Sequence, residues 1–171
     1  ILEPWPHIVM DDFLSPEDLL SLQLKCVQWK EEIILPKIER TGITEGHNRL
    51  NCDPGILKDY NISEYFNQFT RRRPYKELNE RLTLIRMNEG STFPIHCDAP
   101  HKIFALIIYI APEFNLGTVI YDTDGKHGEP IEWKPNRAVM CCPLTDVTWH
   151  SYDSQDDRYT LLYNLVNKRE T

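Results

Sequence analysis

Apolar residues recur at helical spacing near the start of the chain. Ser15 to Asp18 offer an N-cap, a proline at the first helical position and two acidic side chains in the first turn. Apolar side chains then follow at intervals of three and four residues, at Leu19, Leu22, Cys26 and Trp29. These intervals place the apolar side chains on one face of a helix. The pattern predicts an amphipathic helix from about Pro16 to Trp29.

Weaker helical signals follow before the middle of the chain. Ser63 is a candidate N-cap, and aromatic side chains at helical spacing come after it, at Tyr65, Phe66 and Phe69. A further helical turn is expected over Pro74–Asn79. Between the first two helices, residues 36–55 contain proline, three glycines and polar residues without clear periodicity. This composition predicts a long loop with room for an edge strand, and loops of this length often cover functional sites.

The pattern changes at Arg81, where short runs rich in β-branched, aliphatic and aromatic residues begin. Glycine, proline, aspartate and asparagine separate these runs, as is typical of strands and their turns. The predicted strands are Leu82–Asn88, Phe93–His96, Ile103–Ala111, Gly117–Asp122, Arg137–Cys141, Val147–His150 and Tyr159–Val166. Many short strands favour a barrel or jelly roll, with the N-terminal helices packed on its outside.

Length and composition fit one domain of this kind. The chain has 171 residues, of which 41% are hydrophobic, which is enough for a single substantial core. We therefore expect one domain over residues 1–171, of the α+β class and mainly β. Helical support would span about residues 15–80 and the β core about residues 81–167.

Charge and cysteine content narrow the classes of partner. A formal net charge of -7 and a pI near 5.4 disfavour non-specific binding to nucleic acid. No apolar run approaches the roughly 20 residues that a membrane-spanning helix requires, so we expect no membrane partner. The five cysteines are odd in number and show no CxxC spacing, which indicates reduced thiols and a cytoplasmic protein.

His96 and Asp98 have the spacing of two metal ligands on one strand. Alternate residues of a strand point to the same face, about 6 to 7 Å apart. His150 ends another predicted strand, which a barrel would bring alongside. Two histidines and one carboxylate leave three coordination positions open, as in the non-haem Fe(II) oxygenases. His96, Asp98 and His150 are the predicted catalytic metal ligands.

Arg158 is a candidate binding residue for a carboxylate. It begins the last predicted strand and shares a face with Thr160, so that a planar guanidinium lies beside a hydroxyl. Tyr109 ends a very apolar strand and offers a phenolic donor to the same carboxylate. We therefore predict that Arg158, Thr160 and Tyr109 bind an acidic cofactor or co-substrate.

Six segments occur in the order and at the spacing of one known family. They are Trp5–Leu14 as an opening strand, Phe93–Pro100 with the first metal ligands, Leu106–Ile110 with the tyrosine, Gly117–Thr118 as the following turn, Trp149–Ser151 with the distal histidine and Arg158–Thr160 with the arginine. The chain thus resembles the prolyl-hydroxylase-like 2-oxoglutarate/Fe(II)-dependent dioxygenases. The resemblance covers most of the chain.

The resemblance implies a fold and a reaction. The fold would be a double-stranded β-helix, a jelly roll related to the cupins. Iron would be held by the predicted triad, and the far carboxylate of the co-substrate 2-oxoglutarate by Arg158. With O2 as the second co-substrate, the enzyme would hydroxylate a C–H bond and convert 2-oxoglutarate to succinate and CO2. A proline in a peptide or protein would be the leading substrate.

The chain departs from the family pattern at three positions. Members often carry Arg-Tyr-x-x-Gly before the metal ligands, whereas this chain has Met87 in place of the tyrosine. The family's contact from that tyrosine to the 2-oxoglutarate or substrate pocket is therefore absent. Ala138 and Leu116 stand where glycine is common.

Other functions remain open at this stage. A free amino acid or small metabolite is an alternative substrate, and a methylated nucleobase is disfavoured by the acidic charge. A non-catalytic β-helix module with a structural metal such as zinc is an alternative of a different class. Two other polar clusters, His127–Glu129 and Arg71–Arg73, are interpreted as a hairpin tip and a solvated helix end. Taken singly, a His-x-Asp pair is more often a surface pair than a metal site.

Overall fold

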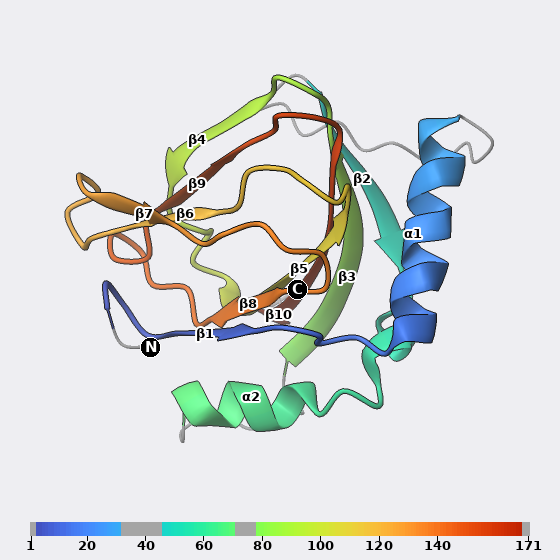
Figure 1. Cartoon of the computed structure of the whole chain (residues 1–171). Coiled ribbons are helices and arrows are strands. Elements are labelled where there is room, and N and C mark those ends of the chain that lie inside the picture. Colours follow the sequence, from blue (N-terminus) through green and yellow to red (C-terminus); the bar gives the residue numbers. More distant parts are fainter. Residues whose placement is uncertain (1–2, 32–45, 71–77, 169–171) are drawn as a thin grey trace.

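A computed structural model describes residues 3–31, 46–70 and 78–168. Two antiparallel sheets form the body of the protein, and the helices lie outside them (Figure 1). The elements are β1 (His7–Met10), α1 (Pro16–Lys30), β2 (His47–Cys52), the 3-10 helix η1 (Pro54–Leu57), α2 (Ile62–Phe69), β3 (Leu78–Met87), β4 (Thr92–His96), β5 (Lys102–Ala111), β6 (Val119–Tyr121), β7 (Gly128–Pro130), β8 (Ala138–Cys141), β9 (His150–Asp153) and β10 (Arg158–Asn167).

The larger sheet has six strands in the order β1-β8-β5-β10-β3-β2, and the smaller sheet has four in the order β4-β9-β6-β7. From β3 onward the chain passes from one sheet to the other and back, so that neighbouring strands are rarely consecutive in the sequence. This connectivity confirms the predicted double-stranded β-helix, with two stacked sheets rather than a closed barrel. The core between the sheets contains Tyr109 and Val139 from the larger sheet and Ile120 from the smaller one.

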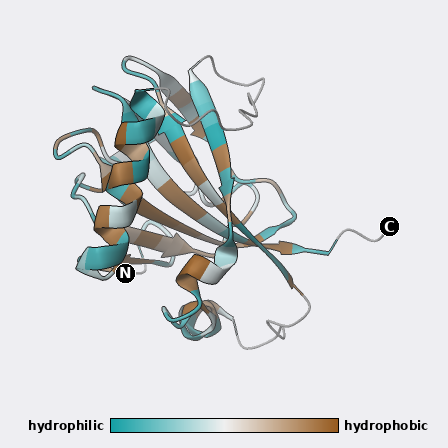
Figure 2. Cartoon of the chain, turned by 90° about the vertical axis from the view of Figure 1, so that its right-hand side faces the viewer, coloured by the Kyte–Doolittle hydropathy of each residue, from teal (hydrophilic) through white to brown (hydrophobic). Residues whose placement is uncertain are grey.

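Helix α1 covers the outer face of the larger sheet, as predicted. The Ser15 side chain accepts a hydrogen bond from the Asp18 backbone N–H at 3.2 Å and so caps the helix. Leu22, Cys26 and Trp29 are its buried residues, and they join the core on the outer face of the sheet. Figure 2 shows the apolar strands that lie behind this helix. The observed helix ends one residue beyond the predicted one. No helix in the described ranges is long and apolar enough to cross a bilayer.

The N-cap predicted for the second helix is wrong. Helix α2 begins at Ile62, and its N-cap is Asn61, which has a positive φ of 50° and makes no side-chain capping bond. Ser63 therefore lies inside the first turn. The apolar face was predicted correctly, because Phe66 is fully buried and packs edge to face on Phe104 at 5.9 Å.

Predictions around the second helix have mixed outcomes. The helical turn expected over Pro74–Asn79 is wrong at its end, because Leu78 and the residue after it begin strand β3. Its first four residues and the arginine cluster Arg71–Arg73 lie outside the described residues. The edge strand allowed for within residues 36–55 is present as β2, which pairs with β3, while residues 36–45 lie outside the described ranges.

The N-terminal region supplies both edge strands of the larger sheet. Strands β1 and β2 form the two edges of the larger sheet, by pairing with β8 and β3 respectively. The region predicted to be helical support therefore also supplies a strand, β2, to the β core. Its alternation places His47 and Arg49 on the inner face, whereas Leu50 and Cys52 pack with the helices.

One strand was predicted in the wrong place. The residues before His150 form a turn, in which the Thr148 hydroxyl bonds to both the N–H and the carbonyl of Leu144, at 3.0 and 3.1 Å. The β-branched pair Val147 and Thr148 favoured a strand there, but this local side-chain bonding overrides that preference. Strand β9 begins at His150 and continues to Asp153. The strand residues that alternate with His150 on one face of β9 therefore follow it in the sequence and do not precede it.

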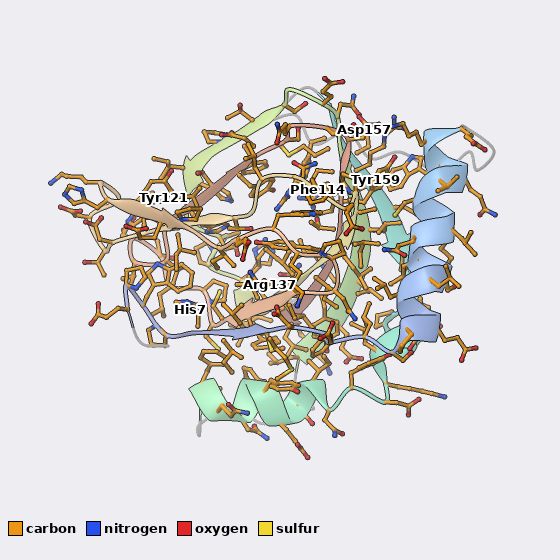
Figure 3. The ribbon with its side chains drawn as sticks, in the orientation of Figure 1. His7, Phe114, Tyr121, Arg137, Asp157 and Tyr159 are labelled. Carbon is orange, nitrogen blue, oxygen red and sulfur yellow. The ribbon has the colours of Figure 1, made fainter. Side chains whose placement is uncertain are left out.

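Ion pairs connect the segment between β1 and α1 to the residues just before β8. Asp11 accepts hydrogen bonds from Arg137 Nε at 2.6 Å and Nη2 at 3.2 Å, and from Lys134 Nζ at 3.0 Å. The Arg137 bond is the largest cause that holds the pKa of Asp11 well below its ordinary value of 3.8. Figure 3 shows Arg137 beside the N-terminal segment.

We expect Asp11→Asn to lower the free energy of unfolding by less than about 1 kcal/mol at neutral pH, because the pair is partly exposed and screened by solvent. A lowered folded-state pKa stabilises the fold above the unfolded pKa and loses that contribution as the pH falls towards the folded value. The difference between the two proteins should therefore narrow below pH 3.8. Urea unfolding at several pH values measures this difference in the free energy of unfolding. A difference that widens in acid would contradict the lowered pKa of Asp11.

Candidate metal centre

Two histidines lie side by side on adjacent strands of the smaller sheet. His96 at the end of β4 and His150 at the start of β9 are direct cross-strand partners, and their ring centroids are 4.2 Å apart. Asp98 follows two residues after His96. The nitrogen of each histidine and one carboxylate oxygen lie within 4.8 Å of one another, close enough for one cation to bind all three. The structure thus brings together the three residues that the sequence predicted as ligands.

Backbone carbonyls fix the orientation of both imidazoles. His96 Nδ1 lies 2.8 Å from the Pro94 carbonyl, and His150 Nδ1 lies 3.0 Å from the Thr148 carbonyl. A carbonyl only accepts, so each Nδ1 carries the proton and donates it, which leaves Nε2 with a free lone pair. A metal-binding histidine usually donates such a hydrogen bond from the ring nitrogen that does not bind the metal, and this bond fixes the orientation of the ring.

The electrostatics favour a cation at this position. Burial lowers the pKa of His96 to about 4, and the neighbouring His150 adds to the shift, so His96 is a neutral ligand at pH 7. Burial raises the pKa of Asp98, but the electrostatic interactions with its neighbours, above all with Lys102, outweigh burial and the net shift is downward. Lys102 pairs directly with the Asp98 carboxylate. Asp98 is therefore ionised and able to bind a metal.

The donor set fits iron. Two imidazole nitrogens and one carboxylate oxygen can occupy one face of an octahedral ion and leave the opposite face for other ligands. No other group of this kind occurs among the described residues. His127 instead lies in the loop between β6 and β7, where its backbone N–H bonds to Asp122 at 3.2 Å. The five cysteines, all within the described ranges, are free thiols.

The guanidinium of Arg158 is buried inside the protein. Its residue is 2% exposed, and burial lowers the pKa of its guanidinium. Its Nη2 donates a weak bond of 3.4 Å to the Thr118 hydroxyl, and its Nε has no partner. Within the described part of the chain it forms no ion pair. An unpaired buried cation is costly, so this arrangement favours an anionic ligand.

Aromatic rings surround the guanidinium of Arg158. Its Cζ is 4.7 Å from the ring centroid of Tyr152, 5.1 Å from Trp133 and 5.5 Å from Tyr109. Tyr109 and Trp133 are stacked, with centroids 4.5 Å apart. These rings stabilise the cation through their π faces and keep water from it. An anion that reaches Arg158 would therefore meet it in surroundings of low polarity.

Tyr109 and Thr160 lie next to each other on adjacent strands of the larger sheet. They are cross-strand partners of β5 and β10, so both side chains point to the inner face with Arg158. The Tyr109 hydroxyl accepts a 2.9 Å bond from the Thr118 backbone N–H, which fixes the phenol. The structure places all three predicted carboxylate-binding residues at one site. Their binding role remains a prediction.

Gly117 permits this arrangement. A Cβ at Gly117 would lie 1.7 Å from the Ile131 carbonyl oxygen, so only glycine fits here. The next residue, Thr118, accepts the hydrogen bond from Arg158 and donates to Tyr109. Close packing at this turn therefore positions two site residues.

Three aromatic or imidazole side chains of the site were missed by the sequence analysis. Tyr152 lies two residues after His150, and its position would have followed had β9 been placed correctly. No sequence pattern singles out His47, whose Nε2 is 3.4 Å from the Tyr152 hydroxyl. Trp133 follows β7 in a segment without regular structure, where no sequence pattern signals its position.

Comparisons with known proteins agree on the fold. The sequence matches no protein-family model and no curated protein. A prolyl hydroxylase from Trichoplax adhaerens, solved with a hypoxia inducible factor peptide fragment, aligns with a TM-score of 0.71 at 13% identity, over 94% of this chain and 83% of that one. A viral collagen prolyl hydroxylase from Paramecium Bursaria Chlorella virus-1, in a 2-oxoglutarate complex, aligns with a TM-score of 0.64 at 12% identity, over 95% and 96%.

A third solved structure is named for the wider family. An oxidoreductase of the 2OG-Fe(II) oxygenase family from Burkholderia pseudomallei aligns with a TM-score of 0.62 at 15% identity, over 94% of this chain and 84% of that one. At these identities the likeness establishes the fold. The chain therefore has the double-stranded β-helix fold of the prolyl-hydroxylase-like 2-oxoglutarate/Fe(II) oxygenases.

Proposed function

We propose that this protein is an Fe(II)- and 2-oxoglutarate-dependent dioxygenase that hydroxylates a C–H bond. The observation that carries the proposal is that two features occur together: the triad of His96 and His150 on the smaller sheet with Asp98 just after β4, and Arg158 on the larger sheet, which forms no ion pair with a described residue. The triad supports a metal ion with open coordination positions. The guanidinium of Arg158 supports a co-substrate that carries a carboxylate.

His96 and His150 would hold the iron through Nε2, and Asp98 through its carboxylate. Iron bound there would supply the activation of O2, coupled to the conversion of 2-oxoglutarate to succinate and CO2. The Pro94 and Thr148 carbonyls keep both imidazoles in the tautomer that this binding requires. The ion pair with Lys102 keeps the Asp98 carboxylate in place.

Arg158 would bind the far carboxylate of 2-oxoglutarate. Its Nε has no partner and its Nη2 makes only a long bond, so the fork is available for a bidentate contact. Thr160 and Tyr109, on the same inner face, would add hydroxyl contacts to this carboxylate. Trp133 and Tyr152 exclude water from it, which strengthens each charged contact.

The substrate proposed from the fold is a prolyl residue of a peptide or protein, with a free amino acid or small metabolite as the alternative. Two of the similar structures are prolyl hydroxylases, one of them solved with a peptide fragment. Fold similarity alone supports the prolyl assignment. A mass-spectrometric search for products 16 Da heavier, among peptides and metabolites incubated with the enzyme, would identify the compound.

The reaction makes one direct prediction. Purified protein supplied with Fe(II) and 2-oxoglutarate should form succinate slowly even without a second substrate, and EDTA should abolish the signal. Zn(II) binds the same ligand types but undergoes no redox change, so zinc-loaded protein is the matched control and should form none. Succinate can be measured by chromatography. If well-folded, iron-loaded protein formed none, the protein would be a binding module with a structural metal.

A further inference from the structure

A second arginine lies on the inner face of the larger sheet. Arg49 of β2 is the cross-strand partner of Ile85 in β3, Ile85 is the partner of Thr160 in β10, and Thr160 is the partner of Tyr109 in β5. Directly paired residues point to the same face of a sheet. Arg49 therefore shares the face that carries Tyr109 and Thr160, at the edge of the sheet.

Arg49 has no anion beside it in the described part of the chain. It is partly buried, its Nε is inaccessible to solvent and has no hydrogen-bond partner, and it takes part in no ion pair with a described residue. Arg86 on the outer face and Arg137 just before β8 differ, since they form ion pairs with Asp157 and Asp11 respectively. A half-buried guanidinium without a partner favours a ligand that carries negative charge.

The surroundings of Arg49 connect it to the metal centre. His47, two residues before it on the same face, is hydrogen-bonded to Tyr152, whose ring centroid is 6.4 Å from that of His96. Burial lowers the pKa of His47 to about 4, and the charge of Arg49 is the next cause. Arg49 is thus within electrostatic reach of the side chains that separate the metal ligands from Arg158.

The charges of 2-oxoglutarate leave Arg49 without a partner. In the proposed reaction one carboxylate of the co-substrate binds iron and the other binds Arg158, so neither remains for a second arginine. Resting on the function proposed above, we propose that Arg49 binds a carboxylate of the substrate that is hydroxylated. Of the two substrate classes named above, Arg49 therefore favours the second: an acid such as a free amino acid, which presents a carboxylate close to its C–H bonds, in place of an internal prolyl residue of a peptide.

Matched pairs of compounds test the proposal. The probes are the free amino acids and their primary amides, which differ only in the carboxylate. Binding to protein loaded with Mn(II) and 2-oxoglutarate is measured by calorimetry, and stimulation of succinate formation is measured in parallel. At least one acid should bind about 10- to 100-fold more tightly than its amide, which is the range for one charge-assisted bond.

Variants assign this preference to Arg49. Arg49→Gln should remove the preference for the acid, and Arg49→Lys should retain part of it. Lys126→Gln is the control, because it deletes the same charge from an exposed position between β6 and β7. Its preference should equal that of the unaltered protein. Circular dichroism checks that each variant is folded.

Several outcomes would overturn the proposal. They are equal affinity for acids and amides, binding of none of the acids, an unchanged preference in Arg49→Gln, or a loss of 2-oxoglutarate affinity in that variant, which would assign Arg49 to the co-substrate. Each of these can occur while the protein still forms succinate, so the proposed dioxygenase function would survive. Conversely, protein that forms no succinate but still prefers acids in the calorimeter would contradict the reaction alone.

Discussion

His96→Ala is expected to abolish iron-dependent succinate formation, with a loss of about a thousandfold or more. Removal even of a residue that only supports a metal ligand typically costs about 10- to 100-fold in metal affinity or activity, and His96 is proposed as a ligand itself. One of its ring nitrogens is among the three donor atoms that lie within 4.8 Å of one another. Succinate formation and the iron content of the protein should fall together.

His127→Ala is the matched control for this experiment. His127 lies in the loop between β6 and β7 and does not belong to the cluster of candidate ligands. Its replacement should leave both iron content and succinate formation close to those of the unaltered protein. Full activity in a folded His96→Ala protein would remove the basis for the proposed metal site.

Arg158→Met is expected to raise the KM for 2-oxoglutarate by a factor of about 30 or more. Truncating one partner of a buried, hydrogen-bonded charge pair typically costs about 2 to 5 kcal/mol, and about 1.4 kcal/mol corresponds to a factor of ten. Methionine is unbranched, flexible and uncharged, and its thioether suits the aromatic rings that surround the guanidinium. Binding of 2-oxoglutarate to the Mn(II)-loaded protein, measured by calorimetry, should weaken to the same degree.

The same substitution should not weaken the fold. A buried cation without a counter-ion is a cost to the ligand-free protein, so replacing Arg158 by an apolar side chain should leave the free energy of unfolding unchanged or raise it. Arg86→Met is the control. Arg86 lies on the neighbouring strand but on the outer face, where it pairs with Asp157, which Figure 3 labels near α1. An equal rise in KM in both variants would contradict a specific role for Arg158.

Much of the site could be predicted because its residues stand at strand ends with a fixed order. His96, Asp98, His150 and Arg158 are polar residues at the ends of apolar runs, and each run was assigned to a strand or its immediate neighbourhood. Alternation along a strand then determines which side chains share a face. The pairing of Tyr109 with Thr160, which puts Tyr109 on the same face as Arg158, is seen only in the structure.

What could not be predicted depends on contacts between distant segments. The position of His47 follows from the pairing of β2 with β3, which no pattern within residues 36–55 specifies. Trp133 reaches the site because its indole donates to the Pro112 carbonyl at 2.9 Å and stacks on Tyr109. The error in the position of β9 has a local cause. The Thr148 hydroxyl bonds to the backbone of Leu144, and this bonding competes with strand formation, which the strand propensity of the residues does not reveal.

The strand order also bears on how the protein is made. β10, the last strand of the described residues, lies near the middle of the larger sheet, between β5 and β3, and β1 pairs with β8 although about 130 residues separate them in the sequence. During synthesis, β3 and β5 would lack the strand that lies between them until β10 had been made. Folds dominated by such long-range pairing form slowly and are prone to aggregation meanwhile. Nascent chains of this protein would therefore depend on chaperones more than a helical protein of the same size would.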